Sequence, residues 1–559
     1  MTDIATRSPV DLMADAFWEY FLERQPIYAS IIGDHRYDDR LGDPGPAGRA
    51  SDRRVLSGVL RDAAALDRDG LGVEDRITLE MLETVARVHL AELEQNLHEF
   101  DSLDHINGPQ TLVNDLARYT QIETDDDFEH LLARLAAYPA YLEAHIANLR
   151  EGIASGRTAA PIVAERTVEQ LERMVVQPAA EAPLLTALAG LSAAQETRLE
   201  AAIVRDVLPS QVSFLEFVRA YLPHVRAGAG VCFLPDGEAV YATAILASTT
   251  LPLGAQELHD FGLEQLAMLD GERLEIARAL GHADVAALRD ALAHDPGNFA
   301  RKPSDLVDLA RQQIERATAL APRAFGRLPR AACQVRAVEP YMEREAPTAF
   351  YLQPAPDGSR PGTYFINTFQ PESRPLHQLA AITYHEAVPG HHFQCSIETE
   401  LDDLHPFRRF GSRLAGIAYT EGWGLYSERL ADEMGLYLDP RERLGMLDMQ
   451  AMRAGRLITD TGLHAFGWDR LRAIDVLEAT GLSRLQSEVE IDRYTVWPGQ
   501  ALAYMVGQRE LMNLRRELAA RDGAAFDLPA FHDQLLGHGA LPLAILRSQL
   551  PAWVRPRGA

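Results

Sequence analysis

Cysteine is scarce in this chain, with three residues among 559: Cys232, Cys333 and Cys395. They are widely separated, so the sequence contains neither a cysteine-based metal motif nor the pattern of a disulfide framework. We expect buried structural thiols. This expectation includes Cys395, which lies beside a cluster of histidines described below.

Basic residues are also under-represented, with 54 Lys and Arg against 81 Asp and Glu and a formal net charge of −27. Nucleic acids and anionic membranes both require a basic protein surface. The charge therefore argues against either as the main partner and predicts good solubility.

Long hydrophobic runs are missing as well. No uninterrupted apolar stretch reaches the length of a membrane span. The first residues, "MTDIATRSPVDLMADAFWEYFLERQP", carry acids where a signal peptide requires a basic start followed by an apolar run. We therefore expect a cytoplasmic protein without a membrane partner. The sequence leaves the oligomeric state open.

What the chain does have is helical periodicity. From about residue 8 to 320, segments such as "DRITLEMLETVARVHLAELEQNLHEF" place apolar side chains on one broad helical face. In "DDFEHLLARLAAYPAYLEAHIANLREGIASG", acids suit a helix N-terminus, and Pro139 predicts a break or kink. These apolar stripes indicate core-facing helices.

The pattern changes near residue 330. "CQVRAVEP", "TAFYLQP" and "GTYFINT" read as short strands, and the turn-forming "APDGSRPG" joins the last two into a predicted hairpin. Helical patterning returns from about Leu376. We predict a mainly α protein with a small antiparallel sheet, divided into residues 1–325 and 326–559 and forming one integrated unit.

The histidine cluster follows the predicted hairpin, in "YHEAVPGHHFQ". It resembles the zinc motif H-E-x-x-H, in which the glutamate acts as a base, except that Pro389 stands where the second histidine belongs. In an unbroken helix, His391 would point about 240° away from His385. Pro389 and Gly390 favour a helix distortion such as a π-type bulge. Relative to H-E-x-x-H, a bulge with two extra residues would bring His391 to the position of the second histidine, whereas His392 would need three. We favour His391, which needs the smaller distortion.

A third zinc ligand is expected, with one position left open for water. "YTEGWGLYSERL" offers Glu421, and Glu428 lies on the same helical face as a supporting residue. The neighbouring glycines, Gly422 and Gly424, would allow a close approach of this helix, and its aromatic residues suggest burial. A buried carboxylate needs a partner such as a metal ion.

Two later stretches complete the predicted site. In "RAGRLITDTGLHAF", Arg456, Asp460 and His464 fall along one helical stripe, where Asp460 could orient His464 as carboxylates do around metal sites. An exposed ion-pair ladder would produce the same spacing.

In "DRYTVWPGQALAYMVGQRE", Pro498 suits the first turn of a helix that carries Gln500. Arg493 and Tyr494 would lie in the loop before it. A phenol can donate a hydrogen bond to an oxyanion, and a guanidinium can bind a carboxylate.

Together these motifs resemble a bacterial family catalogued as domain of unknown function 885 and grouped with the zincin metallopeptidases. The matching stretches are "LERQPIYASIIGDHRYDDRLGD", "HEAVPGHHFQ", "EGWGLYSERL", "DTGLH" and "RYTVWPGQALAYMVG". The resemblance implies a helical fold with a zincin-like catalytic core, similar to helical carboxypeptidases and oligopeptidases.

We therefore expect a zinc-dependent peptidase that hydrolyses short peptides. His385, His391 and Glu421 would hold Zn²⁺, and Glu386 would act as general base. Tyr494 or His464 would stabilise the oxyanion, while a strand at 364–368 would pair with the substrate backbone. His392, Glu428, Asp460, Arg493 and Gln500 would support the metal or the substrate. A zinc hydrolase of another amide or ester, and a non-catalytic helical protein with a structural zinc, are the alternatives.

Overall fold

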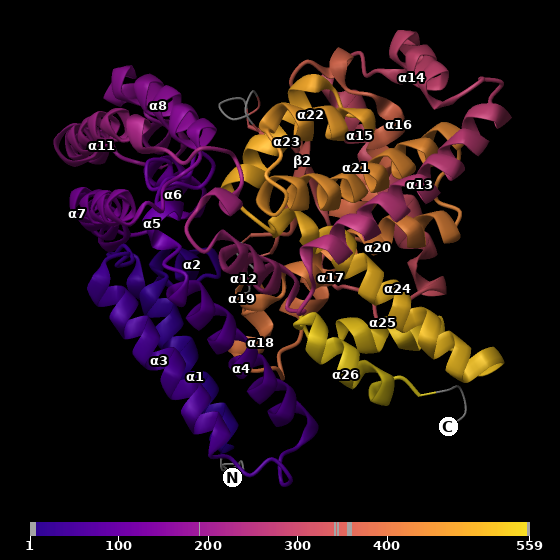
Figure 1. The fold of residues 1–559 in the computed structure, drawn as a ribbon, viewed down its shortest axis with the longest axis horizontal. Coiled ribbons are helices and arrows are strands. Elements are labelled where there is room, and N and C mark those ends of the chain that lie inside the picture. The colour runs from indigo at the N-terminus through magenta and orange to yellow at the C-terminus, as the bar shows by residue number, and fades with distance from the viewer. Residues whose placement is uncertain (1–6, 189, 340–342, 344–345, 355–359, 556–559) are drawn as a thin grey trace. The chain divides into compact units, whose positions relative to one another are not determined.

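The fold is that of a computed structural model, which describes residues 7–188, 190–339, 343, 346–354 and 360–555 (Figure 1). The chain folds into two compact units. Unit 1 comprises Met1–Ala244, Gly462–Ala473 and Glu488–Pro498, and unit 2 comprises Ile245–Thr461, Ile474–Ser487 and Gly499–Ala559. The functional division predicted at residue 325 stays a prediction.

Unit 1 is built from helices, as the periodicity predicted. In Figure 1, α1, α3 and α4 run side by side, and α7, α8 and α11 pack around a second apolar core. The helices of this unit are α1 (Pro9–Arg24), α2 (Pro26–Ile31), α3 (Pro46–Ala64), α4 (Val73–Glu94), α5 (His98–Asp101), α6 (Leu112–Tyr119), α7 (Asp125–Ser155), α8 (Pro161–Val176), α9 (Pro183–Ala187), α10 (Ala193–Ala202) and α11 (Leu208–Tyr221).

Local sequence signals explain where these helices begin and end. The Thr124 side chain accepts a hydrogen bond from the backbone of Asp127, whose carboxylate bonds back to Thr124, and this capping box starts α7. Gly156, with φ of +76°, ends the helix in the left-handed conformation that glycine tolerates. Of the break or kink predicted at Pro139, the break does not occur, since α7 continues through this residue; the kink stays a prediction.

Unit 2 contains the remaining helices and the sheet. Helix α12 (Gly237–Thr249) crosses into it from unit 1, and α21, α22 and α23 also cross between the units. The helices that follow α12, including the three that cross, are α13 (Ala255–Ala279), α14 (Val285–His294), α15 (Pro303–Leu320), α16 (Leu376–Glu386), α17 (His391–Thr399), α18 (Pro406–Phe410), α19 (Ser412–Ala415), α20 (Ile417–Glu433), α21 (Pro440–His464), α22 (Arg470–Ala479), α23 (Arg484–Val496), α24 (Ala503–Asp522), α25 (Leu528–Leu536) and α26 (Leu543–Trp553).

The three predicted strands form a sheet, but it is mixed rather than antiparallel. Strands β1 (Gln334–Ala337), β2 (Ala349–Leu352) and β3 (Thr363–Ile366) are ordered β1-β3-β2, with β1 parallel and β2 antiparallel to β3. The turn predicted between β2 and β3 lies mostly outside the described residues. Because β3 is paired on both sides, it has no free edge for a substrate strand, so the strand addition predicted at 364–368 is wrong.

Helices α20 and α24 approach each other closely in unit 2. A Cβ atom on Gly422 would lie 2.5 Å from the backbone of Gly507, and a Cβ atom on Gly507 would lie 1.8 Å from the carbonyl oxygen of Ala418. Glycine at both positions therefore permits the contact. No helix among the described residues is both long and apolar enough to cross a membrane.

Candidate metal centre

The histidine cluster lies at a break between two helices. Helix α16 ends at Glu386 and α17 begins at His391, so the predicted π-type bulge is instead a complete interruption. A Cβ atom on Gly390 would lie 1.9 Å from the carbonyl oxygen of His385, so only glycine fits this tight connection. The indole of Trp423 donates to the carbonyl oxygens of Pro389 (2.9 Å) and Gly390 (3.2 Å), which holds the break in place.

The break brings His385 and His391 together. Their ring centroids are 4.7 Å apart and the rings are nearly perpendicular. Helix α20 supplies Glu421 to the same place, and donor atoms of the three residues all lie within 4.8 Å of one another. The side chains predicted as metal ligands therefore form one cluster that could hold a metal ion.

Gly424 makes room for this cluster. A Cβ atom at that position would lie 2.7 Å from Cε1 of His385 and 3.0 Å from Cε1 of His391. Any larger side chain would displace one of the two rings. The predicted close approach of the glycine-containing helix is thus confirmed, and its consequence is that α20 lies directly against both imidazoles.

The spacing of the donor atoms fits a metal ion better than direct hydrogen bonds. Oε2 of Glu421 lies 3.7 Å from Nε2 of His385 and 3.5 Å from Nε2 of His391. Hydrogen bonds between such groups are about 2.7–3.2 Å long. Two ligands that each lie about 2.0–2.2 Å from a tetrahedral zinc are about 3.3–3.6 Å apart. In addition, Nδ1 of His391 is buried without a hydrogen-bond partner in the described part of the chain.

A chain of buried polar groups supports His385 from behind. Its Nδ1 bonds to Oε1 of Glu428 at 2.9 Å, and Oε2 of Glu428 accepts from the Gln450 amide at 2.9 Å. The Gln508 amide then donates to Oε1 of Gln450, also at 2.9 Å. The Arg453 guanidinium lies 3.9 Å from Oε1 of Glu428. Such partners fix the orientation of a ligand imidazole.

The carboxylates determine the charge of the metal-free cluster. Burial would lower the pKa of His385, but the neighbouring carboxylates of Glu421 and Glu428 raise it to about 9. Burial would likewise raise the pKa of Glu421, yet the two imidazoles hold it well below its usual range. Without a metal, the cluster therefore favours a protonated His385 beside an ionised Glu421.

His392 does not belong to this cluster. Its Nδ1 lies 3.0 Å from the Tyr351 hydroxyl and 3.3 Å from the Ser396 hydroxyl, and its Nε2 lies 3.1 Å from the carbonyl oxygen of Ala331. Burial lowers the pKa of His392 to about 4. Both nitrogens of this histidine are engaged elsewhere, which supports the choice of His391.

Glu386, the predicted base, is the last residue of α16 and directly follows His385. It is half-buried. Among the described residues, its carboxylate makes no hydrogen bond and no ion pair, unlike those of Glu421 and Glu428. The carboxylate is therefore available to a bound substrate or water.

Three of the predicted residues lie in unit 1. The backbone N–H of Val231 donates to Nδ1 of His464, and Nε2 of His464 lies 2.9 Å from the carbonyl oxygen of Tyr494. The Tyr494 hydroxyl donates to Glu490 at 2.5 Å, and the Arg493 guanidinium donates to Glu490 at 2.8 Å. The expected loop is helix α23 instead. Their catalytic roles stay predictions.

The other two predicted residues lie in unit 2. Asp460 is fully buried, and both its oxygens accept from the Gly499 N–H at 3.2 Å. The hydrogen bonds of His464 go to backbone groups, so the predicted orienting contact from Asp460 is not among them. Gln500 begins a short 3₁₀ turn, Gln500–Leu502, immediately before α24.

Gln450, Arg453 and Gln508 were not anticipated as parts of the support behind His385. The sequence shows only that Gln508 lies one turn after Tyr504 and two turns after Gln500, and this spacing does not by itself indicate a role at a metal site. That role could not be recognised without knowing which face of α24 meets α20.

A family model described as "Bacterial protein of unknown function (DUF885)" matches residues 26–550. The chain belongs to this family. No curated protein matches it. Two solved structures are similar to this DUF885 protein over nearly all of both chains. The first is described as a "putative lipoprotein" from Colwellia psychrerythraea, with 26% identity, a TM-score of 0.91 and coverage of 98% of each chain.

The second similar structure is a "putative lipoprotein of unknown function" from Shewanella oneidensis, with 19% identity and a TM-score of 0.75. It covers 97% of this chain and 99% of that one. The expectation of a cytoplasmic protein is contradicted, because lipoproteins are carried to the cell envelope. The amino-terminal composition that led to the expectation did not reveal this.

Proposed function

We propose that this DUF885 protein is a zinc-dependent hydrolase that cleaves short peptides. The observation that carries the proposal is the cluster of His385, His391 and Glu421, whose donor atoms all lie within 4.8 Å of one another. The 3.5 Å between Glu421 and His391 falls in the range expected for two ligands of one tetrahedral zinc. Three protein ligands leave a fourth position open, which is typical of catalytic rather than structural zinc sites.

Bound zinc would supply an acidified water and polarise the scissile carbonyl group. The residues of the chain do the rest. Glu386, which is adjacent to a ligand and has no competing partner among the residues that the structure describes, takes the proton from the attacking water and passes it to the leaving amine. Glu428 holds His385 with Nε2 directed at the cluster, because Nδ1 is occupied by the hydrogen bond between them.

The resemblance to zincin peptidases supports peptides as the substrate class, and the lipoprotein descriptions of the similar structures favour peptides of the cell envelope. A hydrolase of another amide or ester would use the same residues. A structural zinc has no need of a base, whereas Glu386 directly follows a ligand.

The experiment that tests the proposal combines metal analysis with a peptide library. Purified protein should contain one zinc per chain and cleave members of the library, with the products read by mass spectrometry. Glu386→Gln should retain zinc and lose at least about 100-fold in rate, in line with general-base catalysis.

A matched control is Glu372→Gln, which neutralises an exposed carboxylate just before α16 and should leave the rate unchanged. Protein that lacks stoichiometric zinc would refute the metal centre. If Glu386→Gln cleaves at the wild-type rate, the assignment of the base is wrong. If peptides are untouched while other amides or esters are hydrolysed, only the substrate class is wrong.

A further inference from the structure

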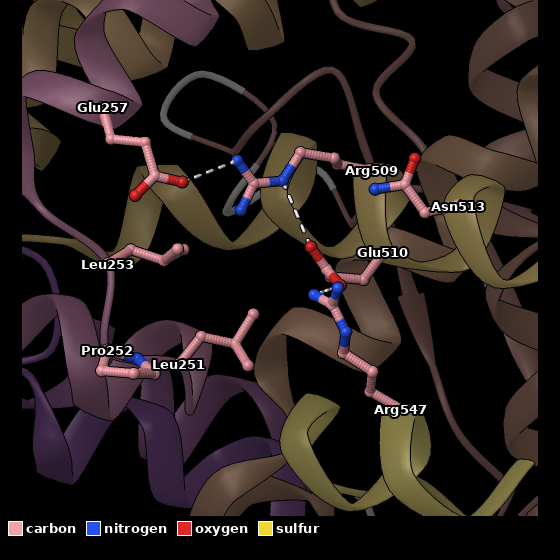
Figure 2. Close-up of a pocket in the computed structure, with 8 residues that line it drawn as sticks. All are labelled: Leu251, Pro252, Leu253, Glu257, Arg509, Glu510, Asn513 and Arg547. Carbon is pink, nitrogen blue, oxygen red and sulfur yellow. Dashed lines mark hydrogen bonds and ion pairs between the residues drawn. The ribbon is translucent and has the colours of Figure 1, made fainter.

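Unit 2 contains a hollow lined by charged and apolar residues (Figure 2). Its volume is about 390 Å³, within the range of about 300–1,000 Å³ that is common for small-molecule pockets. One wall is apolar, and the facing wall comes from α24 and α26. The lining residues are Leu251, Pro252, Leu253, Glu257, Arg509, Glu510, Asn513 and Arg547.

The centre of the charged wall is a buried carboxylate between two guanidinium groups. Glu510 is 4% exposed, and its Oε1 accepts from Nε of Arg509 at 3.2 Å while its Oε2 accepts from Nη1 of Arg547 at 3.0 Å. Figure 2 shows this arrangement, with Arg509 and Arg547 on either side of Glu510. Glu510 therefore fixes both guanidinium groups at the pocket.

The outer charged groups keep open positions. Arg547 is 56% exposed and Glu257 is 54% exposed. Each makes a single hydrogen bond among the described residues, Arg547 with Glu510 and Glu257 with Nη1 of Arg509 at 3.3 Å. The Asn513 amide, which also lines the pocket, has no hydrogen bond there. Free donors and a free acceptor thus border the same hollow.

The apolar wall is held rigidly. Thr250 has φ of +58°, a strained conformation for a β-branched residue. It is held there because its hydroxyl donates to the Thr249 carbonyl oxygen (2.7 Å) and accepts from the N–H of Leu543 (2.8 Å), the first residue of α26. In Figure 2, the side chains of Leu251 and Leu253 extend from this wall towards the charged residues.

We propose that this pocket binds a zwitterionic ligand, a free amino acid or short peptide with an apolar side chain. Two guanidinium groups and two carboxylates line the pocket, so their charges balance. A simple anion or a simple cation would therefore find no excess of the opposite charge. A ligand with both charges uses both open groups. Its carboxylate binds Arg547 in fork geometry, its ammonium group binds Glu257, and its side chain packs on Leu251 and Leu253.

The pocket is separate from the metal centre. Both use α24, but from different faces: Gly507 and Gln508 contact α20, whereas Arg509, Glu510 and Asn513 point to the pocket. The proposal does not depend on the peptidase activity, although hydrolysis of peptides would produce ligands of this class.

Isothermal titration calorimetry on the full-length protein tests the proposal with leucyl-leucine as the probe. The titrations use a host protein that carries Glu421→Gln. This substitution alters the metal centre and is expected to prevent hydrolysis of the peptide during the measurement. We expect saturable binding, with N-acetyl-leucyl-leucine and leucyl-leucinamide each at least about tenfold weaker, because each lacks one charge. Tighter binding of free leucine than of leucyl-leucine would indicate an amino-acid site, and the reverse order a peptide site.

Two variants in the same host connect the binding to the pocket. Arg547→Gln and Glu257→Gln should each weaken leucyl-leucine at least about tenfold. Arg516→Gln on α24 and Glu264→Gln on α13, which are exposed and lie outside the pocket, are the charge-matched controls and should bind normally. Unfolding midpoints establish that all four variants are folded.

The proposal would be overturned if neither leucyl-leucine nor free leucine bound saturably at concentrations up to roughly 10 mM. A blocked peptide that binds as tightly as leucyl-leucine would also overturn it, since the ligand would then not need both charges. The proposal would likewise be overturned if the control variants lost as much affinity for leucyl-leucine as the pocket variants. Binding to wild type that disappears in the Glu421→Gln host would place the probe at the metal centre instead.

Discussion

Buried histidines occur in two very different settings in this protein. In the metal centre, His385 bonds to a carboxylate on one side and faces another carboxylate and a second histidine on the other. In unit 1, His464 bonds only to backbone groups. The pKa values are shifted in opposite directions: burial lowers that of His464 to about 3, whereas two carboxylates raise that of His385 to about 9, although both rings are fully enclosed.

The difference shows that burial does not identify a functional histidine. Burial lowers the pKa of both side chains, and only the two carboxylates around His385 overcome it. Around His464, no carboxylate opposes burial among the described contacts of the ring, and the carbonyl group of Tyr494 only partly offsets it. The chemistry of the partners therefore separates a candidate metal ligand from a structural residue, and the comparison can be tested residue by residue.

The largest effect is expected at His391. His391→Ala should lower zinc affinity by more than about 100-fold, because it removes a ligand rather than a supporting group. His392→Ala is the matched control and should keep its zinc, since both nitrogens of His392 bond away from the cluster. Competition with a chromophoric chelator measures both. The opposite result would transfer the ligand role to His392.

Next is Gly424→Ala. The added methyl group would lie 2.7–3.0 Å from atoms of both ligand imidazoles, so at least one ring must move, and we expect zinc affinity to fall roughly 10- to 100-fold. Gly271→Ala in α13 adds the same methyl group where nothing lies within 4 Å. That control should leave zinc binding intact and stabilise the fold by about 0.4–1 kcal/mol. Unchanged zinc affinity in Gly424→Ala would contradict the geometry of the cluster.

A smaller loss is expected from Glu428→Gln. The amide can still accept from Nδ1 of His385 but no longer provides a negative charge, so zinc affinity should fall about tenfold. Glu433→Gln, on the exposed end of the same helix, should have no effect on zinc. A tenfold loss in both variants would mean that general charge, rather than the contact with His385, controls the affinity.

The smallest effect on zinc affinity is expected from a substitution of His464, which should instead change how the free energy of unfolding depends on pH. The pKa of His464 is about 3 in the folded protein and about 6.5 in an unfolded chain. The unfolded state therefore binds the extra proton first, and the stabilisation present above pH 6.5 is lost as the pH falls towards 3. His464→Gln should bind zinc normally and show a weaker loss of stability across this range, measured by urea unfolding. An unchanged pH dependence would show that other groups control it.

Much of the site could be predicted from local spacing, while its contacts could not. His385, Glu386 and Glu421 are recognisable because zinc chemistry restricts residue types and helical geometry restricts their separation. Gln450 and Gln508 carry no such signal, since an amide becomes part of the support behind a metal site only through its neighbours. The predicted hairpin is confirmed, because β2 and β3 pair antiparallel, whereas the parallel pairing of β1 with β3 depends on long-range contacts, so the expectation of a purely antiparallel sheet was wrong.

The sequence alone determined the helical class, the positions of the strands and the group of residues that could bind a metal, because periodicity and side-chain chemistry are local properties. Only the tertiary structure decided between His391 and His392, since the choice depends on how the chain turns at Pro389 and Gly390 and on where Trp423 holds that turn. It also separated His464 from the histidines of the cluster by their hydrogen-bond partners. The letter for histidine in a sequence does not reveal the charge of its side chain. The surroundings of the imidazole in the folded protein set that charge and therefore what the ring can bind.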